Sequence, residues 1–181
     1  MEKKGKDRGQ EWYNRERSFL KQKRKELSVP DAVHVTALKY FFKRFGDVEV
    51  ERTPIHVDKE KGIDFYVKTA QGTLIGVDSK VRKTENKLLT LEVDWLNTER
   101  KAWLYNTEAE YFLFVHEAKD KGGYDCYLVK VEDARRLVKE VEPRSRRGWR
   151  DPGVAVAVIY FYEYKDLARI GSVAERVFVK F

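Results

Sequence analysis

Two aspartates and a lysine lie within a short stretch of the chain, on segments with the pattern of neighbouring β-strands. Asp64 stands in a run in which apolar and polar residues alternate, and Asp78 and Lys80 stand two residues apart in a second such run. Strand residues two apart share one face of a sheet. Gly72, between the runs, suits the left-handed position at the end of a three-residue hairpin loop.

The register of this hairpin decides whether the three side chains meet. Pairing Phe65 with Val77 joins the apolar faces of the two strands and leaves a loop of the expected length. In this register Asp64 lies directly opposite Asp78, and Lys80 shares their face of the sheet. We expect these three side chains to be exposed on the sheet surface rather than part of the core.

This combination of charges predicts a metal site. Like charges opposite each other destabilise a strand pair, so two facing carboxylates favour a compensating cation. Carboxylate oxygens are hard ligands that suit Mg²⁺ or Mn²⁺, and such a metal lowers the pKa of a bound water and stabilises charge on a phosphate. Lys80 could orient the attacking water or neutralise the phosphate. The same three residues also fit a solvated sheet surface, and spacing alone leaves both interpretations open.

The rest of the chain predicts one mixed α/β domain at residues 29–181, preceded by a charged helical extension at residues 1–28. We expect helices at residues 9–27, 31–46, 132–140 and 166–177. We expect strands at residues 48–52, 63–81 (the hairpin), 88–93, 111–116, 127–131 and 154–162. Residues 143–153, which are rich in Arg, Pro and Gly, are expected to form a basic loop.

The hairpin motifs resemble a known family. The segments Gly62-Ile63-Asp64-Phe65 and Val77-Asp78-Ser79-Lys80-Val81 are similar to the PD-(D/E)xK nuclease pattern, in which an Asp on one strand precedes (Asp/Glu)-x-Lys on the next. The resemblance covers roughly residues 31–135. It implies a restriction-endonuclease-like core, a mixed β-sheet flanked by helices, in which Asp64, Asp78 and Lys80 are catalytic and the two aspartates bind Mg²⁺ or Mn²⁺.

A second stretch is similar to phage and viral members of this group. It consists of an acidic strand at residues 90–93, the Ala102-Trp103-Leu104 turn, and a strand within residues 107–115. The resemblance implies a nuclease of a virus, phage or mobile element, or a host repair enzyme of the same fold. Many relatives act as dimers, so a homodimer stays an open option.

The chain departs from the family pattern in two respects. The Pro of the first motif is replaced by Gly62-Ile63, and residues 32–45 carry no acidic side chain where many members place a glutamate ligand. Glu92 is the candidate for a further metal ligand on the following strand, with Glu11 and Glu16 as alternatives. The number of metal ions therefore stays open.

Charge and composition favour a nucleic-acid partner. The net charge is +7 with a pI of about 9.3, and 37% of residues are charged. A basic balance attracts phosphates by counterion release, although it also merely aids solubility. The abundance of Lys and Glu, with only 3 Gln and 4 Asn, is the bias of thermophile proteins. No apolar run could span a bilayer and no signal peptide is evident, so we expect a cytoplasmic protein without a membrane partner.

Two groups of basic residues are candidates for contacting the nucleic acid, which we expect to be DNA rather than RNA. The first group continues from Lys80 and the second surrounds a tryptophan in the basic loop, where arginine can grip the backbone and the aromatic ring can stack on a base. The groups are Arg82, Lys83 and Lys87, and Arg144, Arg146, Arg147, Trp149 and Arg150.

Other chemistry has no support in the sequence. Three scattered histidines and one cysteine offer no zinc spacing, and neither a Gly-x-Ser-x-Gly nor a P-loop motif is present. We expect His34 to be structural or to contact a phosphate rather than to bind a metal. The sequence therefore predicts a metal-dependent nuclease. The alternatives are a non-catalytic DNA-binding module of the same fold, and a structural or interaction protein that carries a charged hairpin.

Overall fold

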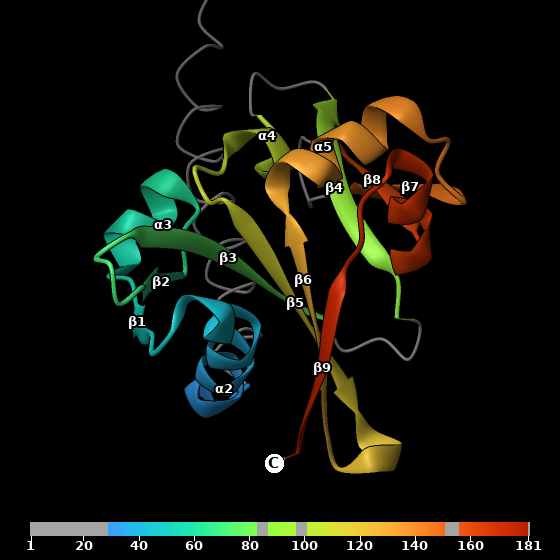
Figure 1. Cartoon of the computed structure of the whole chain (residues 1–181). Helices are drawn as coiled ribbons and strands as arrows, with labels where there is room; N and C mark the ends of the chain where they lie inside the picture. Colours follow the sequence, from blue (N-terminus) through green and yellow to red (C-terminus); the bar gives the residue numbers. More distant parts are fainter. Residues whose placement is uncertain (1–28, 83–86, 97–100, 151–155, 181) are drawn as a thin grey trace, which may run out of the picture.

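The computed structural model describes residues 29–82, 87–96, 101–150 and 156–180 of the chain (Figure 1). The helical extension expected at residues 1–28 lies outside them. The described part is a mixed α/β structure with two sheets. Among its helices, none is long and apolar enough to cross a membrane.

The larger sheet is mixed, with the strand order β1–β2–β3–β5–β6–β9. Strands β3 and β5 run parallel, and every other neighbouring pair is antiparallel. Its strands are β1 (Glu49–Arg52), β2 (Phe65–Lys68), β3 (Leu74–Arg82), β5 (Tyr111–Ala118), β6 (Gly123–Lys130) and β9 (Glu175–Lys180). The predicted hairpin register is confirmed, because Phe65 pairs with Val77 and Gly72 occupies the left-handed loop position with φ 82°.

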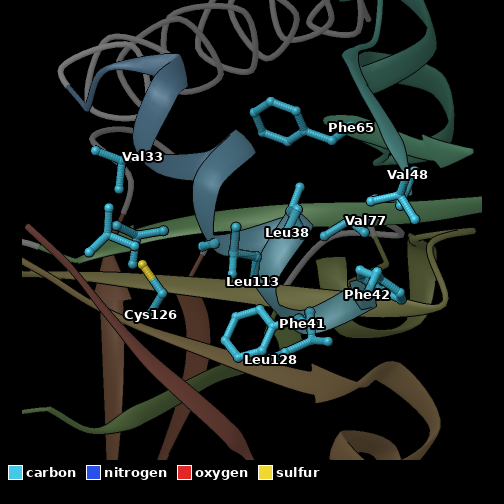
Figure 2. Packing of buried hydrophobic residues seen from close by; sticks show 14 of the residues in the cluster. Val33, Leu38, Phe41, Phe42, Val48, Phe65, Val77, Leu113, Cys126 and Leu128 are labelled. Atoms are coloured by element: carbon cyan, nitrogen blue, oxygen red, sulfur yellow. The ribbon is translucent and has the colours of Figure 1, made fainter. Parts of the chain in front are cut away.

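A helix that begins after Pro30 covers one face of this sheet. Helix α2 (Asp31–Phe42) continues into a 3-10 turn, η1 (Lys43–Phe45), and ends at Gly46 with φ 82°. Its apolar side chains recur three and four residues apart, so they form a stripe that packs on the sheet. Figure 2 shows side chains from the helix and the sheet in this first core: Val33, Leu38, Phe41, Phe42, Phe65, Val77, Leu113 and Leu128.

The opposite face of the sheet is covered by a second, smaller sheet and by three short helices. A three-stranded antiparallel sheet has the order β4–β8–β7, with β4 (Leu89–Leu96), β7 (Ser145–Arg150) and β8 (Val156–Tyr162). With it lie α4 (Trp103–Asn106), α5 (Val131–Glu140) and the 3-10 helix η3 (Tyr164–Ile170). These elements form the second core with the larger sheet: Leu89, Leu91, Leu104, Phe112, Phe114, Val129, Leu137, Tyr162 and Leu167. In Figure 1 they lie together in the upper part of the molecule.

Three parts of the fold differ from the expectation. The basic segment forms the edge strand β7 rather than a loop, because an edge strand has one neighbour and can carry exposed arginines that hide any apolar alternation. The expected closing helix is η3 followed by β9, since Gly171 ends the helical turn with φ 72°. The short helix α3 (Ile55–Lys61), between β1 and β2, was not predicted. A 3-10 turn, η2 (Lys119–Lys121), joins β5 to β6.

Candidate active site

The hairpin brings the two predicted carboxyl groups to neighbouring strands. Asp64 immediately precedes β2, and its backbone N–H donates to the carbonyl oxygen of Val77 over 2.9 Å. The backbone N–H of Ser79 in turn donates to Asp64 Oδ2 over 2.7 Å. The Asp64 carboxylate is therefore fixed against the part of β3 that carries Asp78.

Lys80 completes the cluster on the same face of β3. Its Nζ donates to Asp78 Oδ1 over 2.5 Å, and the side chains of Asp78 and Asp64 are close enough to form a hydrogen bond with each other. The structure thus brings together Asp64, Asp78 and Lys80, as the hairpin register predicted. We call these three residues the carboxylate–lysine cluster.

The expectation that the cluster is exposed was wrong. Relative exposures are 2% for Asp64, 2% for Asp78 and 6% for Lys80. The cause is the partner strand: β5 places Phe112 beside Asp78 and Phe114 beside Lys80, and both aromatic rings belong to the second core. The cluster therefore lies between the two sheets, where charge is expensive unless it is compensated.

An aromatic ring closes one side of the cluster. The Lys80 ammonium lies 5.0 Å from the centre of the Trp103 ring, a cation–π contact, and Trp103 meets Phe112 edge-on at 5.0 Å. Trp103 begins the short helix α4. The Ala102-Trp103-Leu104 turn carries part of the family resemblance, but the sequence alone predicts no role for this tryptophan.

The electrostatics of the cluster favour a bound cation. Burial raises the pKa of the Asp78 carboxyl well above its usual range, the Lys80 ammonium lowers it in part, and the charge of Asp64 raises it again. With every group ionised, the cluster itself contains two carboxylates and one ammonium. An additional cation between the carboxyls would therefore favour the ionised form of both.

Glu92, the candidate for a further ligand, has other contacts. On β4, its Oε1 accepts from Trp95 Nε1 over 2.6 Å and from the backbone N–H of Trp103 over 3.1 Å. Among the residues that the structure describes, no three His, Cys, Asp or Glu side chains come together as a possible metal-binding group. Glu92 thus holds Trp103, the residue that packs on Lys80. The alternatives Glu11 and Glu16 lie outside the described ranges.

Of the first basic group, Arg82 lies on the same strand as the cluster, whereas Lys87 contacts a different part of the sheet. Arg82 follows Lys80 on the same face of β3 and is half-buried, while Lys83 lies outside the described residues. Lys87 forms an ion pair with Asp125, whose side chain is fully buried and also pairs with Arg176 over 2.6 Å. Sequence reasoning missed Asp125 and Arg176, because the pairing depends on the contact of β6 with β9 and with the residues before β4.

The second basic group divides into residues with different roles. Arg144 forms ion pairs with Glu163 over 2.5 Å and with Asp166 over 3.3 Å, so it ties β7 to η3. Arg146 pairs with Glu142 and lies 5.0 Å from the ring of Tyr160. Arg147 is exposed. The side chains of Trp149 and Arg150 are outside what the structure describes.

The buried histidines lie in the core rather than in the cluster. His34 stacks on Phe65 at 5.1 Å, and His116 Nε2 forms a 2.7 Å hydrogen bond with the Tyr164 hydroxyl. Burial lowers the pKa of each to about 4, so both imidazoles are neutral at pH 7. His34 was expected either to be structural or to contact a phosphate, and its contacts in the core agree with the structural role.

The donor set of the cluster fits a hard divalent cation. Asp64 and Asp78 offer carboxylate oxygens from adjacent strands, and both carboxyls are buried together. Mg²⁺ in proteins is commonly held by one or two carboxylates together with substrate phosphates.

Comparisons of the chain with protein-family models, with curated protein sequences and with solved structures found no match.

Proposed function

We propose that this protein is a metal-dependent nuclease that hydrolyses phosphodiester bonds, in DNA rather than RNA, with a restriction-endonuclease-like core. One observation carries the proposal: Asp64, directly before β2, and Asp78 on β3 have interacting carboxyl groups, beside the buried ammonium of Lys80. The element order supports it as well. Helix α2 precedes the antiparallel strands β1, β2 and β3, and β5 lies parallel to β3.

Each residue of the cluster has a distinct part in the proposed reaction. Asp64 and Asp78 would hold Mg²⁺ or Mn²⁺, which would lower the pKa of a bound water and place positive charge near the phosphate. Asp64 is oriented for this by the Ser79 N–H, and Asp78 by Lys80. The Lys80 ammonium then stabilises negative charge that develops on the phosphate oxygens. Trp103 limits the approach of water on its side of Lys80.

A non-catalytic DNA-binding module of the same fold is the second candidate. The observation that favours it is the 2.5 Å ion pair between Lys80 and Asp78, within a cluster that is almost fully buried. A lysine whose role is this buried ion pair would serve the stability of the hairpin rather than a reaction. Cleavage separates the two functions.

The test is incubation of the protein with labelled linear duplex, single-stranded and branched DNA in Mg²⁺, in Mn²⁺ or in EDTA. We expect cleavage that needs the metal and that falls about 100-fold or more in Asp64→Asn. Asp120→Asn, a matched change at an exposed aspartate of η2, should cleave like the unchanged protein. Absence of cleavage on every substrate would exclude the nuclease and leave the two non-catalytic alternatives, which DNA binding separates, and equal cleavage by Asp64→Asn would place the reaction elsewhere.

The raised pKa of Asp78 also predicts how stability depends on pH without metal. A carboxyl whose folded-state pKa lies above its unfolded value binds its proton more tightly in the folded protein, so its contribution to stability is lost as pH rises through the folded pKa. In EDTA, the unfolding free energy of the unchanged protein minus that of Asp78→Asn should therefore fall from pH 4 to pH 8. Urea unfolding at each pH measures it.

Asp125 provides a control of opposite sign in the same experiment. Burial alone would raise its pKa, but hydrogen bonds from Lys87 and Arg176 outweigh burial, and the pKa of Asp125 is lowered. Its contribution to stability is therefore present above the unfolded pKa and is lost as pH falls. A difference for Asp78→Asn that rises with pH, as the one for Asp125→Asn should, would contradict the electrostatics proposed for the cluster.

A further inference from the structure

A tyrosine and an arginine form a contact at the surface of the smaller sheet. Arg146 on β7 pairs in register with Tyr160 on β8, and its guanidinium lies 5.0 Å from the centre of the Tyr160 ring. The Arg146 side chain is 54% exposed, and Tyr160 is half-buried against the second core. A planar cation thus lies on an aromatic ring with its outer side open to solvent, and it also forms an ion pair with Glu142, whose side chain is 79% exposed.

A second tyrosine reaches solvent from the neighbouring helix. Tyr105 on α4 is 48% exposed. Helix α4 packs on β4, and β4 pairs with β8 so that Leu91 lies opposite Tyr160. Partial burial raises the pKa of the Tyr105 phenol, the charge of Arg135 lowers it, and Tyr160 and Asp94 raise it again. Tyr105 and Tyr160 therefore lie in the same region of the surface.

This region is held in place from below. Arg135 on α5 donates from Nε to the carbonyl oxygen of Leu104 over 2.9 Å and from Nη2 to that of Thr107 over 3.2 Å. Both acceptors belong to α4 or directly follow it, so the guanidinium fixes the turn that carries Tyr105. A ring that is already fixed loses little conformational entropy when it binds a ligand.

The same helix connects the surface with the carboxylate–lysine cluster. Trp103 on α4 packs its ring on Lys80, while Tyr105, two residues later, is turned toward solvent. A strand bound at Tyr105 and Tyr160 would therefore lie just outside the wall that Trp103 forms beside the cluster. Bases can stack on such rings only where they are unpaired.

We propose that Tyr105, Tyr160 and Arg146 form a binding site for single-stranded DNA, in which one base stacks on Tyr105 and another on the guanidinium plane of Arg146, which the Tyr160 ring supports. The proposal rests on the nuclease function and deepens it by naming its substrate class. Stacking on aromatic rings is tolerant of sequence, so the site would grip an unpaired segment of any composition. The substrate then carries a single-stranded end, gap or flap next to the bond that is cut.

Fluorescence anisotropy with a labelled oligothymidylate and a blunt duplex hairpin tests the proposal in EDTA, where no cleavage competes. We expect Tyr105→Ala to weaken binding of the oligothymidylate roughly 5- to 100-fold. Tyr105→Phe should bind like the unchanged protein, because the ring is kept. Binding of the duplex hairpin should change less than twofold in either variant, on the order of the measurement error.

A matched control exists on α2. Tyr40 is 47% exposed, and the ammonium of Lys43 lies 4.2 Å from its ring, so Tyr40→Ala removes a comparable exposed tyrosine with a cation on it. Tyr40→Ala should bind the oligothymidylate normally. Equal affinity of Tyr105→Ala and Tyr40→Ala, or an equal loss for single strand and duplex in Tyr105→Ala, would overturn the proposed site.

The outcome is separable from that of the nuclease proposal. Metal-dependent cleavage together with unchanged binding in Tyr105→Ala overturns the single-strand site and leaves the nuclease. Weakened binding in Tyr105→Ala, without cleavage in any metal, overturns the nuclease and leaves a single-strand binding protein. Asp120→Asn, the change at the exposed aspartate of η2, should bind the oligothymidylate normally in EDTA.

Discussion

Replacing Lys80 with alanine should lower the free energy of unfolding by about 3–5 kcal/mol in EDTA at pH 8. The change leaves two carboxyls in contact, each 2% exposed, without the ammonium that lies 2.5 Å from Asp78 in the unchanged protein. For a chain of 181 residues, such a loss corresponds to a fall in Tm of roughly 10 °C. Differential scanning calorimetry measures it.

Two conditions should reduce this loss if the cluster is a metal site. At pH 5 one carboxyl can take up a proton, so the fall in Tm should be smaller than at pH 8. Added Mg²⁺ or Mn²⁺ should raise the Tm of Lys80→Ala by more than that of the unchanged protein, because the cation replaces the missing positive charge.

The control is Lys68→Ala, at an exposed lysine paired with Glu49 over 3.4 Å, which should change stability by less than about 1 kcal/mol. A loss in Lys80→Ala no greater than in Lys68→Ala would contradict the buried ion pair.

Asp64→Asn should have the opposite effect on the metal-free protein. It removes one of two like charges and leaves Asp78 and Lys80 as a balanced pair, while the amide oxygen can still accept the hydrogen bond from the Ser79 N–H. We expect the free energy of unfolding in EDTA to rise by roughly 1–4 kcal/mol, since two unit charges about 4 Å apart repel by about 1 kcal/mol in water and by about 4 kcal/mol in protein surroundings. Such a variant would be more stable and inactive.

The control for this prediction is Asp120→Asn, which should have the same Tm as the unchanged protein, both in EDTA and in Mg²⁺. A lower Tm in Asp64→Asn would mean that the hydrogen bond from the Ser79 N–H to the Asp64 carboxylate stabilises the fold by more than the repulsion between Asp64 and Asp78 destabilises it. The cluster would then be a structural feature of the hairpin. The unchanged protein should also gain stability from Mg²⁺, and Asp64→Asn should not.

The hairpin was predictable because two local signals agree. The apolar alternation around Phe65 and Val77 and the loop glycine Gly72 specify the same register, and the structure has it. That register also placed Asp64, Asp78 and Lys80 on one face. Local pattern was therefore sufficient for the contacts among these three residues.

Burial of the cluster could not be predicted, because it depends on a distant part of the chain. The carboxylate–lysine face is covered by aromatic residues of β5 and by Trp103, which Glu92 holds from β4. None of these contacts has a sequence signal near the hairpin. The same holds for Asp125, whose partners Lys87 and Arg176 lie 38 and 51 positions away in the sequence.

Edge strands limited the prediction of the fold. Half of the residues of β7 are arginine, and residues 145–148 are all exposed, so this part lacks the alternation that marks a half-buried strand. The strand β9 does alternate, with Val179 buried and Phe178 and Lys180 exposed, but its first residues, 175–177, were assigned to an expected helix that in fact ends at Gly171. Weak or competing local signals thus explain both errors.

The proposed mechanism requires that Asp64 and Asp78 together bind a divalent cation, and titration with Mn²⁺ followed by electron paramagnetic resonance measures this binding. Free Mn²⁺ gives a strong signal that diminishes on binding, so the isotherm reports the metal without a need for substrate. We predict that the unchanged protein and Asp120→Asn bind Mn²⁺ in competition with Mg²⁺, and that Asp64→Asn and Asp78→Asn each lose this binding. Equal binding isotherms for all four proteins would contradict a metal site at the carboxylate–lysine cluster.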